Sequence, residues 1–229
     1  IRMLNRVMNL AHMLTQNARR HGGRIGFIWG DRSYTWREIE AKVNALAAAL
    51  AARGIAKGDR ILVHSRNCDE MFWSMFAAFR LGAVWVPTNF RLMPDEVAYL
   101  ATASGAKGFL CHGDNAEHAA AVKAAHPALD FIWRIGDTGS FGERTVAEAM
   151  AAQSDARVEE ARVDYNDPCW FFFTSGTTGR SKAAVLTHGQ MAFVVTNHLA
   201  DLMPGTDEND ASLVVAPLSH GAGVHQLVQ

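Results

Sequence analysis

The chain has 229 residues, of which 49% are hydrophobic and 9% aromatic, so it has enough apolar side chains to form a large core. Its 22 lysines and arginines nearly balance its 23 acidic residues, which excludes a long-range attraction to nucleic acid or to an acidic membrane. The longest apolar run, Met71 to Phe79, is far too short to span a bilayer, so we expect no transmembrane segment.

The first predicted helix begins with a capping box, in which Thr35 stands three residues before Glu38. Apolar side chains then recur at helical spacing as far as Leu50. Gly54 should end this helix at the C′ position.

Short apolar strands then alternate with helices. The predicted elements are, in chain order, a strand at Arg60–His64, a helix at Asp69–Leu81 stopped by Gly82, a strand at Ala83–Pro87, a helix from Pro94 to about Ala103, a strand at Gly108–Cys111, a helix at Asn115–Ala125 and a strand at Phe131–Ile135. Such alternation indicates right-handed βαβ crossovers and a mainly parallel sheet layered with helices on both faces. The predicted fold class is therefore α/β.

Residues 136–166 are richer in charged and small residues, which predicts a loop, one helix and a surface connector. A subdomain boundary is expected near Asp164. The chain would then divide into a first α/β subdomain, 1–163, and the start of a second, 164–229.

The three cysteines are an odd number and form no CxxC pair. Cys68, Cys111 and Cys169 each lie in or beside an apolar stretch, as is typical of buried thiols in a reducing compartment such as the cytoplasm. We expect neither a disulfide nor a zinc site.

The densest polar motif is the turn TSGTTGRSK, Thr174 to Lys182, between apolar runs at Trp170–Phe173 and Ala183–Leu186. Because both runs read as strands, the turn should close a hairpin. A Walker A loop is excluded, since it needs the spacing GxxxxGK[ST] and leads from a strand into a helix.

The composition of this turn suits an anion. Glycines allow successive N–H groups to converge on one point, hydroxyls donate further hydrogen bonds and a lysine adds a full positive charge. The candidate phosphate-binding residues are Thr174, Ser175, Gly176, Thr177, Thr178, Gly179 and Lys182. A flexible Gly/Ser/Thr hairpin without a ligand is the alternative.

TSGTTGRSK followed by LTH resembles the phosphate-binding signature (Y/F)TSGTTGxPKG of the adenylate-forming superfamily, which contains acyl-CoA synthetases, luciferase-like enzymes and peptide-synthetase adenylation domains. The segment 32–92 is similar to that family's N-terminal region in order and spacing, and APLSHGAG resembles its PL(F/Y)HxxG element. Ser181 stands where proline is usual, which should loosen the backbone there, and Ala183 stands where glycine is usual.

The resemblance implies the first part of the large N-terminal domain of the adenylate-forming fold. It also implies ATP-dependent activation of a fatty or aryl acid to an acyl-adenylate, followed by transfer of the acyl group to coenzyme A. Mg²⁺ would be bound by the phosphates rather than by protein ligands. The acid substrate would lie beside His220, Gly221 and Gly223, and no catalytic residue is assigned within these 229 residues.

The chain has no initiator methionine and stops inside an apolar segment, so a fragment is expected, lacking the C-terminal domain and inactive by itself. The alternatives are an amino-acid adenylation domain, a nucleotide-phosphate-binding module without catalysis, and a scaffold whose loop has lost its ligand. The composition leaves a homo-oligomer open.

Overall fold

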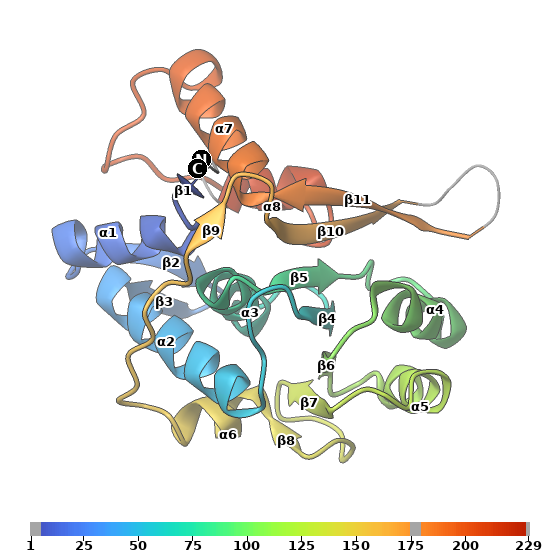
Figure 1. Cartoon of the computed structure of the whole chain (residues 1–229). Helices are drawn as coiled ribbons and strands as arrows, with labels where there is room; N and C mark the ends of the chain where they lie inside the picture. Colours follow the sequence, from blue (N-terminus) through green and yellow to red (C-terminus); the bar gives the residue numbers. More distant parts are fainter. Residues whose placement is uncertain (1–5, 175–179, 228–229) are drawn as a thin grey trace.

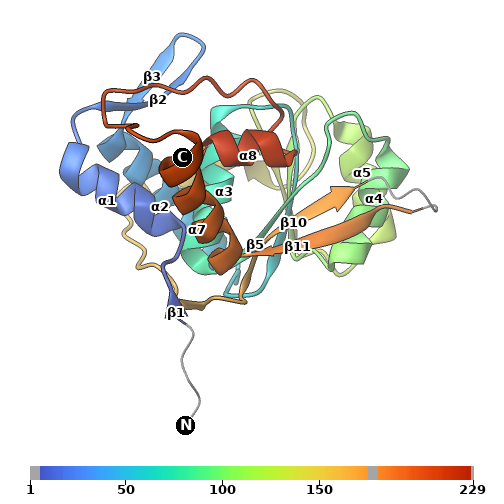
Figure 2. The ribbon, with the colours of Figure 1, turned by 90° about the horizontal axis from the view of Figure 1, so that it is seen from above.

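The computed structural model describes residues 6–174 and 180–227 (Figures 1 and 2). Its helices are α1 (Ala11–His21), α2 (Trp36–Ala52), α3 (Asp69–Leu81), α4 (Pro94–Ser104), α5 (Ala116–Ala125), α6 (Val146–Ala151), α7 (His188–Asn197), the π-helix η1 (His198–Leu202) and α8 (Gly221–Leu227). Its strands are β1 (Arg6–Val7), β2 (Ile25–Trp29), β3 (Arg32–Thr35), β4 (Arg60–His64), β5 (Val84–Pro87), β6 (Gly108–His112), β7 (Phe131–Ile135), β8 (Arg144–Thr145), β9 (Val163–Asp164), β10 (Pro168–Thr174) and β11 (Lys182–Thr187).

The centre of the molecule is a seven-stranded sheet in the order β11-β10-β5-β4-β6-β7-β8. All neighbours from β10 to β8 pair in parallel, and β11 alone is antiparallel to its neighbour, β10. The predicted α/β class with a mainly parallel sheet is confirmed. Two smaller two-stranded sheets, β1–β9 and β2–β3, lie outside it.

Helices cover both faces of this sheet, because side chains along each central strand alternate between two cores. In β4, Ile61 and Val63 belong to the core under α1, α2, α3 and α6, whereas Leu62 belongs to the core under α4 and α5. These two helix groups lie on opposite sides of the strands in Figure 1. The helix α3 is buried along almost its whole length, as the run Met71 to Phe79 predicted.

Local signals set the helix ends where the sequence predicted them. Thr35 and Glu38 form the capping box of α2, and Gly54 follows its last turn with φ +79°. Gly82 ends α3 with φ +66°, and Pro94 stands in the first turn of α4.

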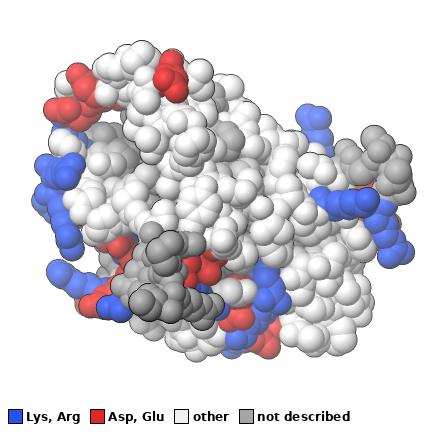
Figure 3. Space-filling model, turned by 45° about the horizontal axis from the view of Figure 1, so that its top comes forward, with Lys and Arg blue, Asp and Glu red and all other residues white. Residues whose placement is uncertain are grey.

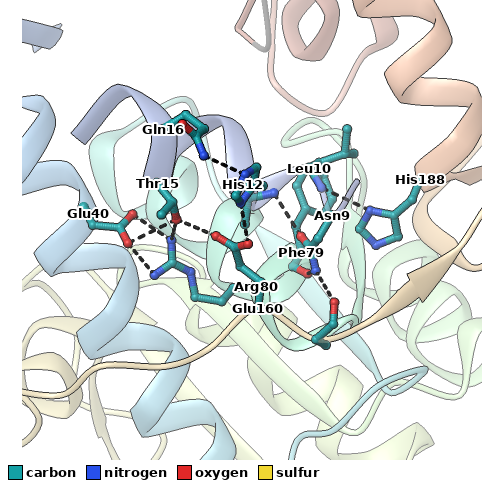
Figure 4. A network of polar contacts seen from close by, with 12 residues as sticks. Asn9, Leu10, His12, Thr15, Gln16, Glu40, Phe79, Arg80, Glu160 and His188 are labelled. Atoms are coloured by element: carbon teal, nitrogen blue, oxygen red, sulfur yellow. Dashed lines mark hydrogen bonds and ion pairs between the residues drawn. The ribbon is translucent and has the colours of Figure 1, made fainter. Parts of the chain in front are cut away.

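Several elements were not predicted, namely α1, the β2–β3 hairpin, the β1–β9 pair, β8, α7, η1 and α8. For α7 a local signal was present and was overlooked, since Thr187 and Gln190 form a capping box. Polar side chains fix α1 to distant parts of the chain (Figure 4): Thr15 Oγ1 donates to Glu160 at 2.5 Å and accepts from Arg80 at 3.1 Å. The partners are 145 and 65 residues away in sequence, beyond the reach of a local pattern.

The residues that follow Asp164 enter the central sheet, where Trp170 of β10 pairs with Trp85 of β5. The division into 1–163 and 164–229 stays a prediction. Within the described ranges, no helix is both long and apolar enough to cross a membrane.

Candidate functional site: the hairpin end and the turn before α8

The β10–β11 hairpin presents the polar turn. β10 runs parallel to β5, and its last residue, Thr174, lies directly opposite Lys182, the first residue of β11. The prediction that the turn joins two strands is therefore confirmed. Of the seven predicted phosphate-binding residues, Thr174 and Lys182 are described and both are exposed, while Ser175, Gly176, Thr177, Thr178 and Gly179 lie outside the described residues.

The end of this hairpin carries two positive charges, Arg180 and Lys182. Arg180 and Lys182 are both exposed, and no carboxylate in the described ranges forms an ion pair with either of them. Lys and Arg side chains appear at the right-hand end of the molecule in Figure 3, the end towards which the hairpin points in Figure 1. The two cations and the neighbouring hydroxyl of Thr174 are complementary to an anion that carries several negative charges, such as a polyphosphate.

Helix α4 holds the limb of the hairpin that leads into β11. The Tyr99 hydroxyl donates to the carbonyl of Ser181 at 3.4 Å, and the Arg180 guanidinium lies 5.1 Å from the centre of the Tyr99 ring. Tyr99 also packs against the same core cluster as Phe171 and Phe173. Tyr99 was not predicted as a site residue, because its position on a predicted helix carried no sign of this contact.

The opposite face of β10 carries the second part of the site. Phe172 points to this face, and its ring lies 6.3 Å from the His220 ring in an edge-on arrangement. His220 stands directly before α8, so the turn 217–220 brings it against the strand that ends at Thr174. His220 thus packs against β10, the strand whose last residue, Thr174, begins the polar turn.

The two predicted glycines beside His220 occupy close-packed positions. A Cβ on Gly223 would stand 2.4 Å from the carbonyl oxygen of Pro217, so the tight turn itself requires glycine there. A Cβ on Gly221 would meet the Trp170 ring at an ordinary 4.0 Å. A role for either glycine in holding a substrate stays a prediction.

His188, the last residue of the LTH motif, is completely buried at the start of α7. Its Nδ1 accepts a hydrogen bond from the backbone N–H of Leu10 at 3.4 Å, and Phe79 packs against its ring edge-on. Burial lowers its pKa to about 4, so the ring is neutral at pH 7. The contact with Leu10 gives His188 a structural role, because it ties the start of α7 to the start of α1.

The cysteines are poor candidates for nucleophiles. Burial raises the pKa of Cys68 to about 11 and that of Cys111 to about 12, and it raises the pKa of Cys169 as well. All three are thiols at neutral pH. In the described ranges, no group of three or more His, Cys, Asp or Glu side chains is placed to hold a metal ion.

The sequence of the chain is similar to those of known enzymes. A family model described as AMP-binding enzyme matches residues 14–228. A feruloyl-CoA synthase from an Amycolatopsis species is 33% identical over 90% of this chain, and a crotonobetaine/carnitine–CoA ligase of Proteus mirabilis is 28% identical over 82% of it. The chain spans only 36% and 37% of the lengths of these two relatives.

Solved structures agree with this relationship. The ATP-bound structure of MatB from Rhodopseudomonas palustris is similar with a TM-score of 0.83 and 25% identity, covering 96% of this chain and 42% of that one. The N-terminal domain of FACL13 from Mycobacterium tuberculosis, bound to an inhibitor, gives a TM-score of 0.84 and 27% identity over 97% of this chain and 54% of that one.

Proposed function

Since the chain belongs to the family of AMP-binding enzymes, among relatives that are acyl-CoA ligases, we propose that the protein activates a fatty or aryl carboxylic acid with ATP and transfers the acyl group to coenzyme A. The observation that carries this proposal is the β10–β11 hairpin, which sets Thr174 opposite Lys182 beside Arg180, a cation that forms no ion pair within the described ranges. Because the chain spans about a third of its curated relatives, the whole reaction is assigned to the complete protein.

The chemistry needs little from the protein besides position and charge. A carboxylate is already ionised at neutral pH, so it attacks the α-phosphate without a general base, and pyrophosphate leaves. Lys182 and Arg180 offset the negative charge that collects on the departing pyrophosphate, and Thr174 donates its hydroxyl to a phosphate oxygen. The protonated cysteines fit this scheme, because no protein nucleophile takes part.

The acid lies on the His220 side of β10. His220, Gly221 and Gly223 line the place where the carboxylate meets the nucleotide, next to the apolar rings of Phe172 and Trp170. An apolar wall favours an alkyl or aryl acid over a zwitterionic amino acid. Mg²⁺ would be bound through the phosphates. The three thiols suit a reducing compartment such as the cytoplasm.

ATP–pyrophosphate exchange tests the proposal on a panel of fatty, aryl and amino acids. Exchange with one acid class identifies the substrate. Lys182→Ala should reduce it about a hundredfold, which is within the range for the loss of one group that stabilises transition-state charge. Arg20→Ala is the control, since this exposed arginine belongs to α1, which lies on the opposite side of the molecule from the hairpin end in Figures 1 and 2, and it should leave the rate unchanged.

Two results would contradict the proposal. One is the absence of exchange with every acid from the complete protein, and the other is full exchange in Lys182→Ala. Exchange with amino acids alone would identify an amino-acid adenylation domain instead. The 229-residue chain by itself we expect to bind ATP without exchange, as a phosphate-binding module would.

A further inference from the structure

Asn67 lies in the loop between β4, which ends at His64, and α3, which begins at Asp69. This loop leaves the carboxyl end of a central parallel strand, and that edge of an open α/β sheet is where ligands bind. Asn67 was not among the predicted site residues. Its half-buried amide nevertheless bonds to a segment about 150 residues further along the chain.

The Asn67 side chain forms a two-way clamp on that segment. Its Nδ2 donates to the carbonyl of Ala216 at 3.0 Å, and its Oδ1 accepts from the backbone N–H of Leu218 at 2.8 Å. Both distances are ordinary for strong N–H···O bonds. A side-chain amide is the group that can donate and accept in this way with one planar end.

Few hydrogen bonds tie residues 211–219 to the rest of the described chain, although Leu218 packs into the core. Within this described segment, the hydrogen bonds to other parts of the chain are the two from Asn67. Leu213 and Val215 are 79% and 74% exposed, whereas Leu218 and Ser219 are buried. The clamp therefore stands at the point where an exposed segment turns into the core.

The clamp also decides where His220 lies. The backbone N–H of His220 bonds to the carbonyl of Pro217, and the N–H of Val224 bonds back to His220, so residues 217–224 form one continuous turn into α8. Asn67 forms hydrogen bonds to the residues on both sides of Pro217. A shift of this turn would carry His220 away from Phe172.

We propose that Asn67 is a positioning residue for the acid-binding half of the site, because its clamp on Ala216 and Leu218 sets the place of His220 against β10. The inference rests on the proposed function, in which His220 borders the acid. It separates the two halves of the site, since among the described residues Asn67 forms no hydrogen bond to the hairpin that would hold ATP.

The test compares Asn67→Ala with a matched variant, Asn89→Ala, in the complete protein. Asn89 is a half-buried asparagine in the loop after β5, and its Oδ1 accepts a local hydrogen bond from the N–H of Arg91. For the acid with the fastest exchange in the panel, Asn67→Ala should raise KM about tenfold, which corresponds to losing two hydrogen bonds. The KM for ATP and the melting temperature should stay close to wild type, and Asn89→Ala should change none of the three.

A second measurement follows the clamp without any substrate. Amide hydrogen exchange of residues 213–220 should become faster in Asn67→Ala and remain as in wild type in Asn89→Ala. An unchanged KM for the acid together with unchanged exchange overturns the inference, as does an equal rise in both KM values with a lower melting temperature. If wild type shows no acid-dependent turnover, the proposed function and the assignment of His220 both fail, while amide exchange still decides whether the clamp exists.

Discussion

Arg80, in α3, is a buried charged residue that the fold must supply with hydrogen-bond partners. Its side chain is only 1% exposed, and its two terminal nitrogens donate to both carboxylate oxygens of Glu40 at 2.8 and 2.7 Å (Figure 4). It also donates to Asn44 at 2.6 Å. A buried cation needs such partners, and the partners in turn need the cation.

Arg80→Met should therefore destabilise the protein strongly. Methionine fills similar volume but leaves Glu40 without its charged partner, and removing one member of a buried ion pair costs about 3 to 5 kcal/mol. Because Glu40 keeps some contact with water, we expect the lower end of that range. The measurement is the urea midpoint of unfolding at constant m.

Glu143→Gln gives the matched control for this prediction. It removes the charge from the Arg53–Glu143 pair, whose side chains are 35% and 40% exposed, so it should cost less than about 1 kcal/mol. Equal losses in Arg80→Met and Glu143→Gln would show that the buried network adds no more than a surface pair.

At the scale of elements, the sequence predicted most of those with local signals, although the capping box of α7 at Thr187 was overlooked. The capping box at Thr35, the glycine after α2 and the alternation of apolar strands with helices predicted most of the sheet and its layers. Helix α1 was missed because its contacts are with Arg80 and Glu160, far away in the chain. For the same reason the sequence predicted the polar hairpin but neither Asn67 nor Tyr99, whose partners are about 150 and 82 residues away.

The anchoring of the hairpin by α4 can be tested at Tyr99. Tyr99→Phe removes the hydroxyl that bonds to Ser181 at 3.4 Å, and Tyr99→Leu also removes the ring beneath Arg180. A long hydrogen bond and an exposed cation–π contact are each worth about 0.5 to 1 kcal/mol. We expect ATP affinity to fall about twofold in Tyr99→Phe and about fivefold in Tyr99→Leu, with faster amide exchange of residues 180–184.

Tyr165→Phe is the control for Tyr99, because it removes the hydroxyl of a tyrosine that lies beside Gly189 at the start of α7. It should leave ATP affinity and exchange of residues 180–184 unchanged. If Tyr99→Leu behaves like wild type in both measurements, α4 does not hold the hairpin. The amide exchange remains informative even if the protein binds no ATP.

At the scale of the whole molecule, two completely buried histidines should control stability in acid. His64 Nδ1 donates to Thr88 Oγ1 at 2.6 Å, since that hydroxyl donates in turn to the carbonyl of Val63. Its Nε2 has no hydrogen-bond partner among the described residues, so a proton placed there would be buried and unpaired. In His188, Nδ1 already accepts a hydrogen bond from the N–H of Leu10. A proton on Nδ1 would place two N–H groups, that of Leu10 and that of the ring, against each other.

The folded protein therefore keeps both rings neutral well below their usual titration. Burial lowers the pKa of His64 to about 3, helped by His118 and His112, and that of His188 to about 4, with Asp167 acting in the opposite direction. In the unfolded chain both titrate near 6.5. Unfolding thus takes up protons between pH 6.5 and about 4. The free energy of unfolding should therefore be highest above this window and fall as the pH drops through it.

Each histidine can contribute a slope of up to about 1.4 kcal/mol per pH unit within that window. Urea midpoints measured between pH 8 and pH 4.5 should therefore be constant above pH 7 and then decline, and His64→Gln should decline less steeply because glutamine cannot be protonated. His126→Gln is the control: this ring is only partly buried and bonds through Nε2 to the carbonyl of Ala106, so the slope should stay as in wild type. A midpoint that does not change from pH 8 to pH 4.5 would mean that the two rings reach water in the folded protein, which contradicts their burial between the sheet and its helices.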